Sequence, residues 1–353
     1  MTSAKSIMNA DFFSVLTFVF WSVNLTTAIS LQSLSNASER NAASIGLIGD
    51  PNDVSTTTVG ATIIVGGGQD VDEVYQWMIE KAGGGDFVVL RASGTDAYNS
   101  YIYELGSINS VETLLIDSRT LANNALVERT ILSAEAVFIA GGDQANYVNF
   151  WKNTKVHHAL NFVRNVKKIP VGGTSAGCAI LGEAYFSALE GTVTSPEALS
   201  NPYMNLVTLG YKDFMNQPYL SNVITDSHFD NRDRHGRLVT FLARMNHDHG
   251  IQARGIGLDE STAVCIESNG IGKIIGSGSA YFLTQNGMDS TPETCRDGSP
   301  LDWYRYQKAV KVYKIQATTD GSHTFDLNTW GSGTGGIHMY YYVRGGVLYK
   351  TYY

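Results

Sequence analysis

Residues 169–183 read IPVGGTSAGCAILGE, which is an apolar run, a serine flanked by glycines, and a run compatible with a helix. The apolar run Ile169 to Val171 predicts a buried strand, and Ala176 to Glu183 predicts the helix that follows it. Glycines 173 and 177 allow a sharp turn, which exposes Ser175 at the C-terminal end of the strand and directs the N–H of Ala176 at a developing oxyanion. Ser175 is therefore a candidate nucleophile, and a plain glycine-rich turn is the alternative interpretation.

The same alternation of strands and helices extends through the middle of the chain. Apolar runs of strand length, most of them closed by glycine, are Thr62 to Val65, Phe87 to Leu90, Thr113 to Ile116, Val137 to Ala140 and Ile169 to Val171. Helical periodicity in Val71 to Ala82 and in Leu121 to Ile131 predicts crossover helices between the strands. The pattern predicts an α/β fold with a mostly parallel sheet flanked by helices.

Further elements extend the predicted domain toward the C-terminus. Asn222 to Thr225, Gly257 to Glu267 and Lys273 to Gly276 have the composition of strands, and Arg237 to Asn246 has that of an amphipathic helix. We therefore expect one domain over residues 58–317. Residues 318–353 are rich in glycine and tyrosine, and this composition predicts a β-rich C-terminal extension packed on the domain.

The first 57 residues differ from the rest of the chain. Phe12 to Val23 is an uncharged apolar run, preceded by Lys5 and followed by small residues. It is too short for a spanning helix and has the length of the apolar region of a signal peptide, so residues 1–30 are expected to direct the chain to a secreted or other exported compartment. Residues 31–57 are polar and small, which predicts a linker. After removal of the leader, no membrane association is expected.

The composition excludes several classes of function. Charged residues make up 16% of the 353 residues and hydrophobic residues 43%, as expected of a folded chain that carries little charge. With 25 Lys and Arg against 33 Asp and Glu, the formal net charge is -8, so a nucleic acid partner is not expected. Residues Gly66 to Gly68 lack a third glycine at the spacing that dinucleotide binding requires, and no cofactor is expected.

Three cysteines, Cys178, Cys265 and Cys295, stand at no spacing typical of metal ligands. Cys265 lies in an apolar run and is expected to be a buried thiol. A bridge between Cys265 and Cys295 is the alternative in an exported chain. His247, Asp248 and His249 could chelate a metal but lack a further obvious ligand, so no metal site is predicted.

A serine nucleophile requires a general base, and His228 is the best placed histidine for that role. It follows the predicted strand Asn222 to Thr225, at the sheet edge where parallel α/β enzymes carry their functional groups. Arg232, Arg234 and Arg237 follow within nine residues, and guanidinium groups at a sheet edge suit the recognition of carboxylates. The alternative is a solvated basic helix face, for which Asp230 and Asp233 supply acids.

Four blocks in this order resemble the peptidase family that contains cyanophycinase and the aspartyl dipeptidase called peptidase E. Each block alone is weak, but together they are specific. They are residues 138–144 (FIAGGDQ), residues 172–179 (GGTSAGCA), residues 226–229 (DSHF) with the arginines that follow, and residues 255–263 (GIGLDESTA). The resemblance covers residues 58–317 and implies a serine hydrolase on a class I glutamine amidotransferase-like scaffold.

The resemblance also implies roles for individual residues. It makes Ser175 the nucleophile, His228 the base and Glu260 the acid, with Asp259 as the fallback acid and Gly142 joining Ala176 as an oxyanion donor. It places Gln144, Asp226, Arg232, Arg234 and Arg237 at the positions that form the substrate pocket in cyanophycinase, which cleaves after β-linked aspartyl residues bearing arginine. The implied partner is an aspartyl peptide or cyanophycin-like substrate, and a homodimer is one assembly that the resemblance allows. Ser227 departs from cyanophycinase, where glutamine is typical, and this puts the substrate in doubt.

Two other functions compete with this interpretation. An α/β-hydrolase esterase shares the motif around Ser175 but needs a base late in the chain, for which His338 is the candidate. A noncatalytic binding protein on the same scaffold would be expected to lose Ser175 or His228, and the chain keeps both.

Overall fold

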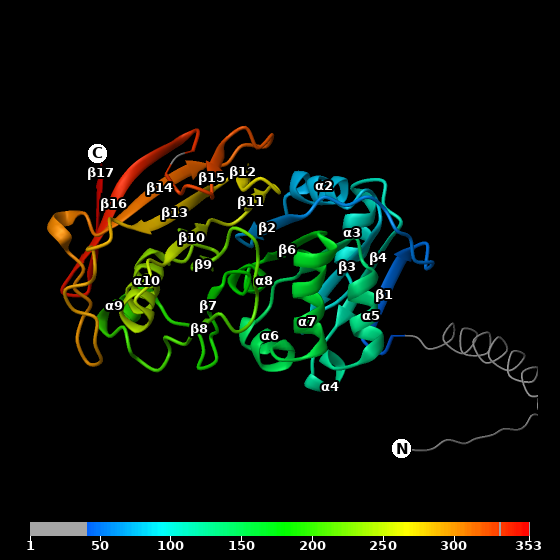
Figure 1. Ribbon diagram of the computed structural model, residues 1–353, viewed down its shortest axis with the longest axis horizontal. Helices are drawn as coiled ribbons and strands as arrows, with labels where there is room; N and C mark the ends of the chain where they lie inside the picture. Colours follow the sequence, from blue (N-terminus) through cyan, green and yellow to red (C-terminus); the bar gives the residue numbers. More distant parts are fainter. Residues whose placement is uncertain (1–40, 332, 353) are drawn as a thin grey trace, which may run out of the picture. The chain divides into compact units, whose positions relative to one another are not determined.

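Five parallel strands form the centre of a nine-stranded sheet, as the apolar runs in the sequence predicted (Figure 1). The computed structural model describes residues 41–331 and 333–352. Within the nine-stranded sheet, β4, β3, β5, β6 and β2 are parallel neighbours, and the strands at both ends are antiparallel. The strands in spatial order are β1 (Ser44–Gly49), β4 (Ser110–Leu115), β3 (Asp86–Arg91), β5 (Ala136–Ile139), β6 (Pro170–Thr174), β2 (Ala61–Val65), β11 (Thr262–Ile266), β12 (Ile271–Gly276) and β15 (Thr324–Asp326).

A second sheet has eight strands and is mostly antiparallel, whereas the sequence had predicted one sheet. Only β10 with β9 and β9 with β7 pair in parallel. In spatial order it contains β17 (Val347–Tyr352), β16 (Gly336–Arg344), β14 (Val310–Gln316), β13 (Ser279–Gln285), β10 (Arg254–Leu258), β9 (Val223–Asp226), β7 (Ala184–Phe186) and β8 (Leu209–Tyr211). The protein is therefore a mixed α/β protein with two sheets.

Helices cover both faces of the parallel strands. Residues of β3 alternate between two cores: Phe87 and Val89 pack with α2 and α3, while Val88 and Leu90 pack with α5, α6 and α7. Burial on both faces explains why these strands are apolar without interruption. The helices are α2 (Asp72–Lys81), α3 (Tyr98–Glu104), α4 (Arg119–Ala122), α5 (Ala125–Ser133), α6 (Gln144–Trp151), α7 (Lys155–Phe162), η1 (Val163–Lys167), α8 (Ala176–Ala179), α9 (Ser195–Ser200), α10 (His235–His249) and η2 (Arg305–Gln307).

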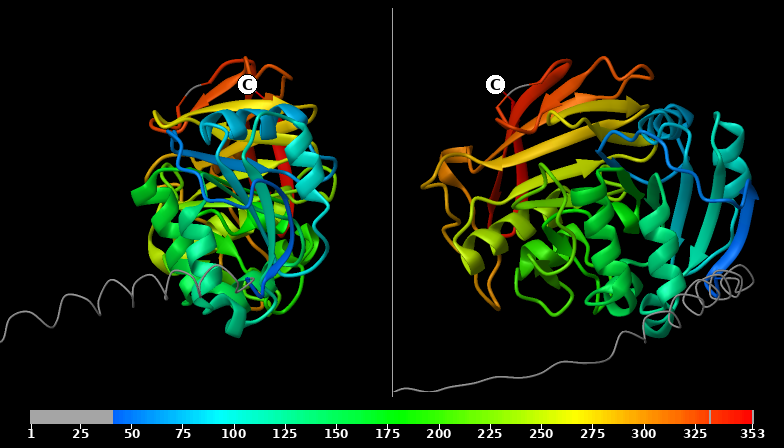
Figure 2. Two further views of the ribbon diagram at one scale, coloured as in Figure 1. Left: turned by 90° about the vertical axis from the view of Figure 1, so that its right-hand side faces the viewer. Right: turned by 45° about the vertical axis from the view of Figure 1, so that its right-hand side comes forward.

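The two sheets extend beyond residues 58–317, the range predicted for the domain, at both ends. Ser44–Gly49 lies in the expected linker but forms β1, which pairs with β4 at the edge of the nine-stranded sheet. At the other end, β15 joins the same sheet, and β16 and β17 complete the eight-stranded sheet. The right-hand view of Figure 2 shows these C-terminal strands, in orange and red, continuing the sheet of the yellow strands. β15, β16 and β17 of the predicted extension are thus part of the two sheets.

Three predicted elements differ in length from those observed. The helix expected over Leu121 to Ile131 is two helices, because the Asn124 side chain accepts from the backbone N–H groups of Leu126 and Val127 and starts α5. The helix expected over Ala176 to Glu183 is the single turn α8, because the chain then packs closely on β9: a Cβ on Gly182 would lie 2.4 Å from the Val223 carbonyl oxygen. The single strand expected over Gly257 to Glu267 is two strands, because a turn separates the end of β10 at Leu258 from β11.

The predicted signal peptide, residues 1–30, and residues 31–40 of the expected linker lie outside the described residues. The signal peptide stays a prediction. In the described part of the chain, no helix has the length and apolarity needed to cross a membrane. The three cysteines are buried and free, and Cys265 and Cys295 belong to different hydrophobic clusters, so the alternative of a bridge between them is wrong.

Candidate active site

Ser175 occupies a strained turn between β6 and α8. Its φ of 53° and ψ of -113° lie in a region that side chains rarely adopt, and such strain is common at functional sites. The flanking glycines are required by close contacts. A Cβ on Gly177 would lie 2.2 Å from the Ile139 carbonyl oxygen, and one on Gly173 would lie 2.7 Å from the Gly177 backbone. The turn therefore has the tight geometry that the glycine spacing predicted.

The side chains of Ser175, His228 and Glu260 form one hydrogen-bonded chain. Ser175 Oγ lies 2.8 Å from His228 Nε2, and His228 Nδ1 lies 2.6 Å from Glu260 Oε1. Asp259, the fallback acid, instead accepts from the backbone N–H groups of Asp230 and Ser279. The structure thus brings the three predicted side chains together, with Glu260 as the carboxylate.

Parallel pairing of β9 with β10 explains how residues far apart in sequence meet. Asp226 at the end of β9 is paired with Gly257 near the end of β10, so the turns after both strands lie at one sheet edge. His228 follows β9 with a φ of 47°. A Cβ on Gly257 would lie 2.6 Å from the Phe229 ring, so the glycine lets the turn that carries His228 pack on β10.

The segment Val65 to Gly68 holds the backbone of all three turns, and sequence reasoning missed this role. The Val65 carbonyl accepts from Ser175 N at 3.1 Å, the Gly66 carbonyl from His228 N at 2.8 Å, and the Gly67 carbonyl from Ser261 N at 2.8 Å. The sequence pattern excludes a dinucleotide motif at these three glycines but does not indicate their contacts with the active-site turns. Their position directly after a buried strand was the available signal. Because each carbonyl fixes a different turn, this segment sets the relative positions of the three side chains.

The loop after β5 brings Gly141 and Gly142 next to the serine. A Cβ on Gly141 would lie 3.4 Å from Ser175 Cβ. Tyr147 Oη lies 2.8 Å from the Ala140 carbonyl oxygen and 3.1 Å from that of Gly141. In a trans peptide the N–H points opposite to the preceding carbonyl, so the Gly142 N–H is directed away from Tyr147. The buried Tyr147 ring therefore fixes the orientation of the predicted oxyanion donor.

A pocket with a volume of about 390 Å³ contains the predicted substrate-binding residues Gln144, Arg232, Arg234 and Arg237, together with Gly142. The loop over residues 188–194 supplies much of its other wall. Asp143 is the one acid among the described residues that line it. The pocket is consequently rich in positive charge and suits a ligand that carries carboxylates.

The three arginines differ in how free they are to bind a ligand. Arg237 is 2% exposed and binds Asp226 with two hydrogen bonds, of 2.8 Å from Nε and 2.5 Å from Nη2. Arg234 donates to the Ser227 carbonyl oxygen at 2.8 Å and lies 3.4 Å from Asp226. Arg232 is exposed, and its guanidinium has no hydrogen bond or ion pair with the described residues. Asp226 thus holds Arg237 and Arg234 in place. Arg232 is the arginine that is available to a ligand.

Burial lowers the pKa of His228, and the nearby positive charges of Arg232 and Arg234 lower it further, while Glu260 opposes this change. A base must be neutral before the reaction. The lowered pKa therefore keeps His228 neutral, and competent as a base, over more of the range below neutral pH.

Replacing Arg232 by glutamine is expected to raise the pKa of His228, because one of the two positive charges that lower it is removed. The acid limb of kcat/KM should then move to higher pH, so activity at pH 6 should fall by a larger factor than activity at pH 8. The measurement is a pH profile with a neutral ester, at low and high salt, since salt screens such interactions. Arg244→Gln, which removes a guanidinium of α10 that is paired with Asp248, is the control. An unchanged or lower apparent pKa would contradict the expectation.

The other candidate residues lie elsewhere. His338 is on β16 with its ring centroid 4.5 Å from that of Tyr313, and the imidazole bonded to Ser175 is that of His228, so His338 is not the base that an esterase would need. His247 and Asp248 contact each other and Tyr203 at the surface. No group of three or more His, Cys, Asp or Glu among the described residues is arranged to hold a metal ion.

A serine, an imidazole and a carboxylate in this order can form and hydrolyse an acyl intermediate, and the comparisons with known proteins agree with hydrolytic chemistry. Residues 92–274, more than half of the chain, match the model of peptidase family S51. The chain therefore belongs to peptidase family S51, and it is a peptidase. The resemblance drawn from the four sequence blocks is confirmed at the level of the family.

Similar proteins include cyanophycinases from three organisms. The cyanophycinase of Geminocystis herdmanii is 24% identical over 242 residues, which is 65% of this chain and 83% of that protein. That of Synechococcus elongatus is 28% identical over 244 residues, 66% of this chain and 70% of that protein. That of a Nostoc species is 27% identical over 245 residues, 66% of this chain and 76% of that protein.

Two solved structures show limited similarity to the chain. One is a peptidase from an acI-B1 actinobacterium, with 15% identity, a TM-score of 0.49, and coverage of 76% of this chain and 98% of that chain. Another is a putative peptidase E from Listeria monocytogenes, with 15% identity, a TM-score of 0.40, and coverage of 62% of this chain and 98% of that chain.

Proposed function

We propose that the protein is a serine-type peptidase that hydrolyses aspartyl peptide bonds, with a β-aspartyl, cyanophycin-like peptide as its substrate. The observation that carries the proposal is the hydrogen-bonded chain from Ser175 through His228 to Glu260, beside a pocket lined by arginines. The matches to cyanophycinases support the choice of substrate. The departure at Ser227 is a reason to test that choice directly.

The proposed reaction begins when Ser175 Oγ attacks the carbonyl carbon of the bond to be cleaved, while His228 Nε2 takes its proton. Glu260 holds the imidazole by its Nδ1 and stabilises the imidazolium that forms. The N–H groups of Ala176 and Gly142 donate to the oxyanion. His228 then protonates the leaving amine, and a water molecule, activated by the same imidazole, releases the acyl group from Ser175.

The charged pocket accounts for the proposed preference for aspartyl substrates. The exposed guanidinium of Arg232 is suited to bind a substrate carboxylate, with Gln144 as a neutral partner. Arg237 donates its hydrogen bonds to Asp226, so its role is to stabilise the pocket and not to bind the substrate. The arginine side chain of a cyanophycin-like substrate would be repelled by these groups, so we expect it to lie outside the arginine cluster, where Asp143 is the nearest acid of the lining.

Product analysis by mass spectrometry tests the proposed function. The protein is incubated with a polymer of β-linked Asp-Arg units, with a panel of α-linked Asp-X peptides, and with matched peptides in which asparagine replaces aspartate. Release of β-Asp-Arg from the polymer is the expected result. If only the α-linked peptides are cleaved, the proposed β-aspartyl substrate is wrong, while the proposed peptidase activity stands. Cleavage of the asparagine peptides as fast as the aspartyl ones would contradict recognition of a carboxylate.

Arg232→Ala is expected to lower kcat/KM for aspartyl peptides by about tenfold or more, because a charge-assisted hydrogen bond to the substrate is lost. At pH 8, above the acid limb that His228 controls, a neutral ester should be hydrolysed at a rate much closer to that of the wild type. The steady-state kinetics of both substrates provide the measurement. Arg237→Met serves for comparison: it leaves Asp226 without its buried partner, so it should lower the melting temperature and affect both substrates alike. Equal losses on both substrates for Arg232→Ala would point to a structural role for this arginine too.

A further inference from the structure

A larger pocket lies at the start of β10, the end of this strand opposite to the turn that carries Glu260. Arg254, which lines it, is the first residue of β10, while Glu260 follows the last. The pocket has a volume of about 650 Å³, the size of a site for a small organic ligand. Apart from Arg254, its lining residues belong to the chain beyond residue 274, outside the part that matches the family.

Two cations in this pocket have no acidic partner. The side chain of Arg254 is half-buried and Lys311 is exposed, and neither forms an ion pair with the described residues. No aspartate or glutamate is found among the described residues that line the pocket, although the chain as a whole carries a net charge of -8. Burial lowers the pKa of Arg254. A half-buried guanidinium without a counter-charge is costly, and an anionic ligand would relieve that cost.

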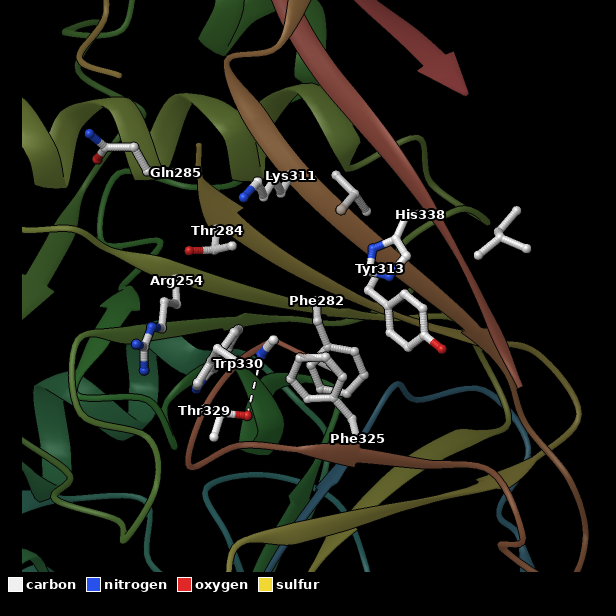
Figure 3. Close-up of a pocket in the computed structure, with 13 residues that line it drawn as sticks. Arg254, Phe282, Thr284, Gln285, Lys311, Tyr313, Phe325, Thr329, Trp330 and His338 are labelled. Atoms are coloured by element: carbon white, nitrogen blue, oxygen red, sulfur yellow. Dashed lines mark hydrogen bonds between the residues drawn. The ribbon is translucent and has the colours of Figure 1, made fainter. Parts of the chain in front are cut away.

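Aromatic rings form the wall next to these cations. Phe282 and Phe325 stack with their centroids 3.8 Å apart, and Trp330 meets Phe325 edge to face at 5.6 Å. Figure 3 shows Arg254 beside Trp330 at one end of the pocket and Tyr313 beside His338 at the other. Phe282 and Phe325 are 2% exposed and Trp330 is 7% exposed, so these rings are embedded in the wall and make that side of the pocket apolar and aromatic.

Trp330 adds a second unmatched donor. The residue is 7% exposed, and its indole Nε1 has no hydrogen-bond acceptor among the described residues. The guanidinium carbon of Arg254 lies 5.0 Å from the centroid of the Trp330 ring. Stacking on a ring leaves the N–H donors in the plane of the guanidinium free. Two adjacent donor groups that both lack an acceptor favour a ligand that brings acceptor oxygens.

We propose that this pocket binds a planar aromatic carboxylate. The carboxylate would accept from Arg254 and from Trp330 Nε1, with Lys311 adding charge at the rim, and the ring would lie against the aromatic wall. A ligand of this class carries no positive charge, in contrast to the arginine-bearing peptide proposed for the active site. The proposal does not depend on the peptidase activity, because none of these residues belongs to the chain of Ser175, His228 and Glu260.

Calorimetric titration of the full-length protein with 2-naphthoate tests the proposal. We expect one saturable site. The neutral analogue 2-naphthalenemethanol and the non-aromatic acetate should each bind at least about tenfold more weakly, because each lacks one of the two recognised features. The Ser175→Ala variant should bind 2-naphthoate as the wild type does, so that loss of peptidase activity and loss of this site remain distinguishable.

Substitutions assign the binding to named groups. Arg254→Gln is expected to weaken 2-naphthoate binding by about tenfold or more, and Trp330→Phe, which keeps a ring but removes the indole donor, by severalfold. Lys311→Gln, at the exposed rim, cannot disturb the core and should weaken binding by severalfold. Arg244→Gln is the matched control, since this guanidinium lies 3.7 Å from the Tyr203 ring centroid but is already paired with Asp248. It should leave binding unchanged.

Three results would overturn the proposal. The first is the absence of saturable binding to the folded wild-type protein. The second is equal affinity for 2-naphthoate and 2-naphthalenemethanol, which would show that no cation recognises the carboxylate. The third is wild-type affinity in both Arg254→Gln and Lys311→Gln, with each variant shown to be folded by its melting temperature.

Discussion

Ser175→Ala is expected to lower kcat for aspartyl peptides by about three orders of magnitude or more. Loss of one member of a nucleophile, base and acid unit removes most of the acceleration, and what remains comes from oxyanion stabilisation and substrate binding. The substitution deletes only Oγ, whose hydrogen bond is to His228 Nε2. The loss of one such bond changes stability by about 1 kcal/mol. The variant should therefore stay folded and inactive.

Peptide cleavage followed by chromatography, with melting temperatures in parallel, measures this effect. Ser221→Ala is the control, because this exposed serine hydrogen bonds to Glu183 away from the site. The double variant Ser175→Ala with His228→Ala should be no worse than either single variant, since the residues act as a unit. Near wild-type activity in Ser175→Ala, or multiplying losses in the double variant, would contradict the assignment.

The parallel half of the fold could be predicted from sequence because its signals are local. Strands such as β3 are buried on both faces and are apolar without interruption. The eight-stranded sheet depends on pairings that are not local signals: β14 pairs antiparallel with β13 on one side and with β16 on the other. A two-residue periodicity indicates a strand but not its partner. The tail was therefore predicted as β-rich, yet its place in the two sheets was not.

The edge strand β1 shows another limit of sequence patterns. Ser44–Gly49 contains two glycines, and its Ile45 and Leu47 side chains are exposed, so no buried face marks it as a strand. Its pairing with β4 supplies the order that its composition does not. The polar and small residues of this region thus predicted a linker where the chain forms a strand.

Some features of the active site could likewise be predicted from the sequence, and others could not. Ser175 and His228 could be chosen from sequence because each follows a recognisable strand, and Glu260 was assigned by resemblance. The pairing of Arg237 with Asp226 could not be predicted, because it depends on how α10 packs against β9. The three arginines therefore have different roles although they are close in sequence. Arg232 is exposed to a ligand, Arg234 lines the pocket and also contacts Asp226, and Arg237 is buried against Asp226.

Gly67→Ala is expected to lower kcat by about a hundredfold or more, although residue 67 carries no reactive group. A Cβ at this position would lie 2.4 Å from His228 Nε2 and 2.5 Å from Cε1, so the imidazole has to move away from Ser175 Oγ. A displacement of about 1 Å in a catalytic group can cost a factor of about 100 in rate. The φ of Gly67 is +86°, which adds backbone strain to the collision. The substrate pocket lies among other residues, so KM should change much less than kcat.

Gly287→Ala separates the two effects of Gly67→Ala, which are the collision with His228 and the backbone strain. Gly287 has a φ of +92°, close to that of Gly67, but a Cβ there would have no neighbour within 4 Å. Both variants should lose stability through strain, of the order of 1 kcal/mol, and only Gly67→Ala should lose activity. Steady-state kinetics and thermal unfolding of both variants make the comparison. If the two variants are equally active, the imidazole does not depend on the space at residue 67, and the segment Val65 to Gly68 positions the active-site turns through its backbone alone.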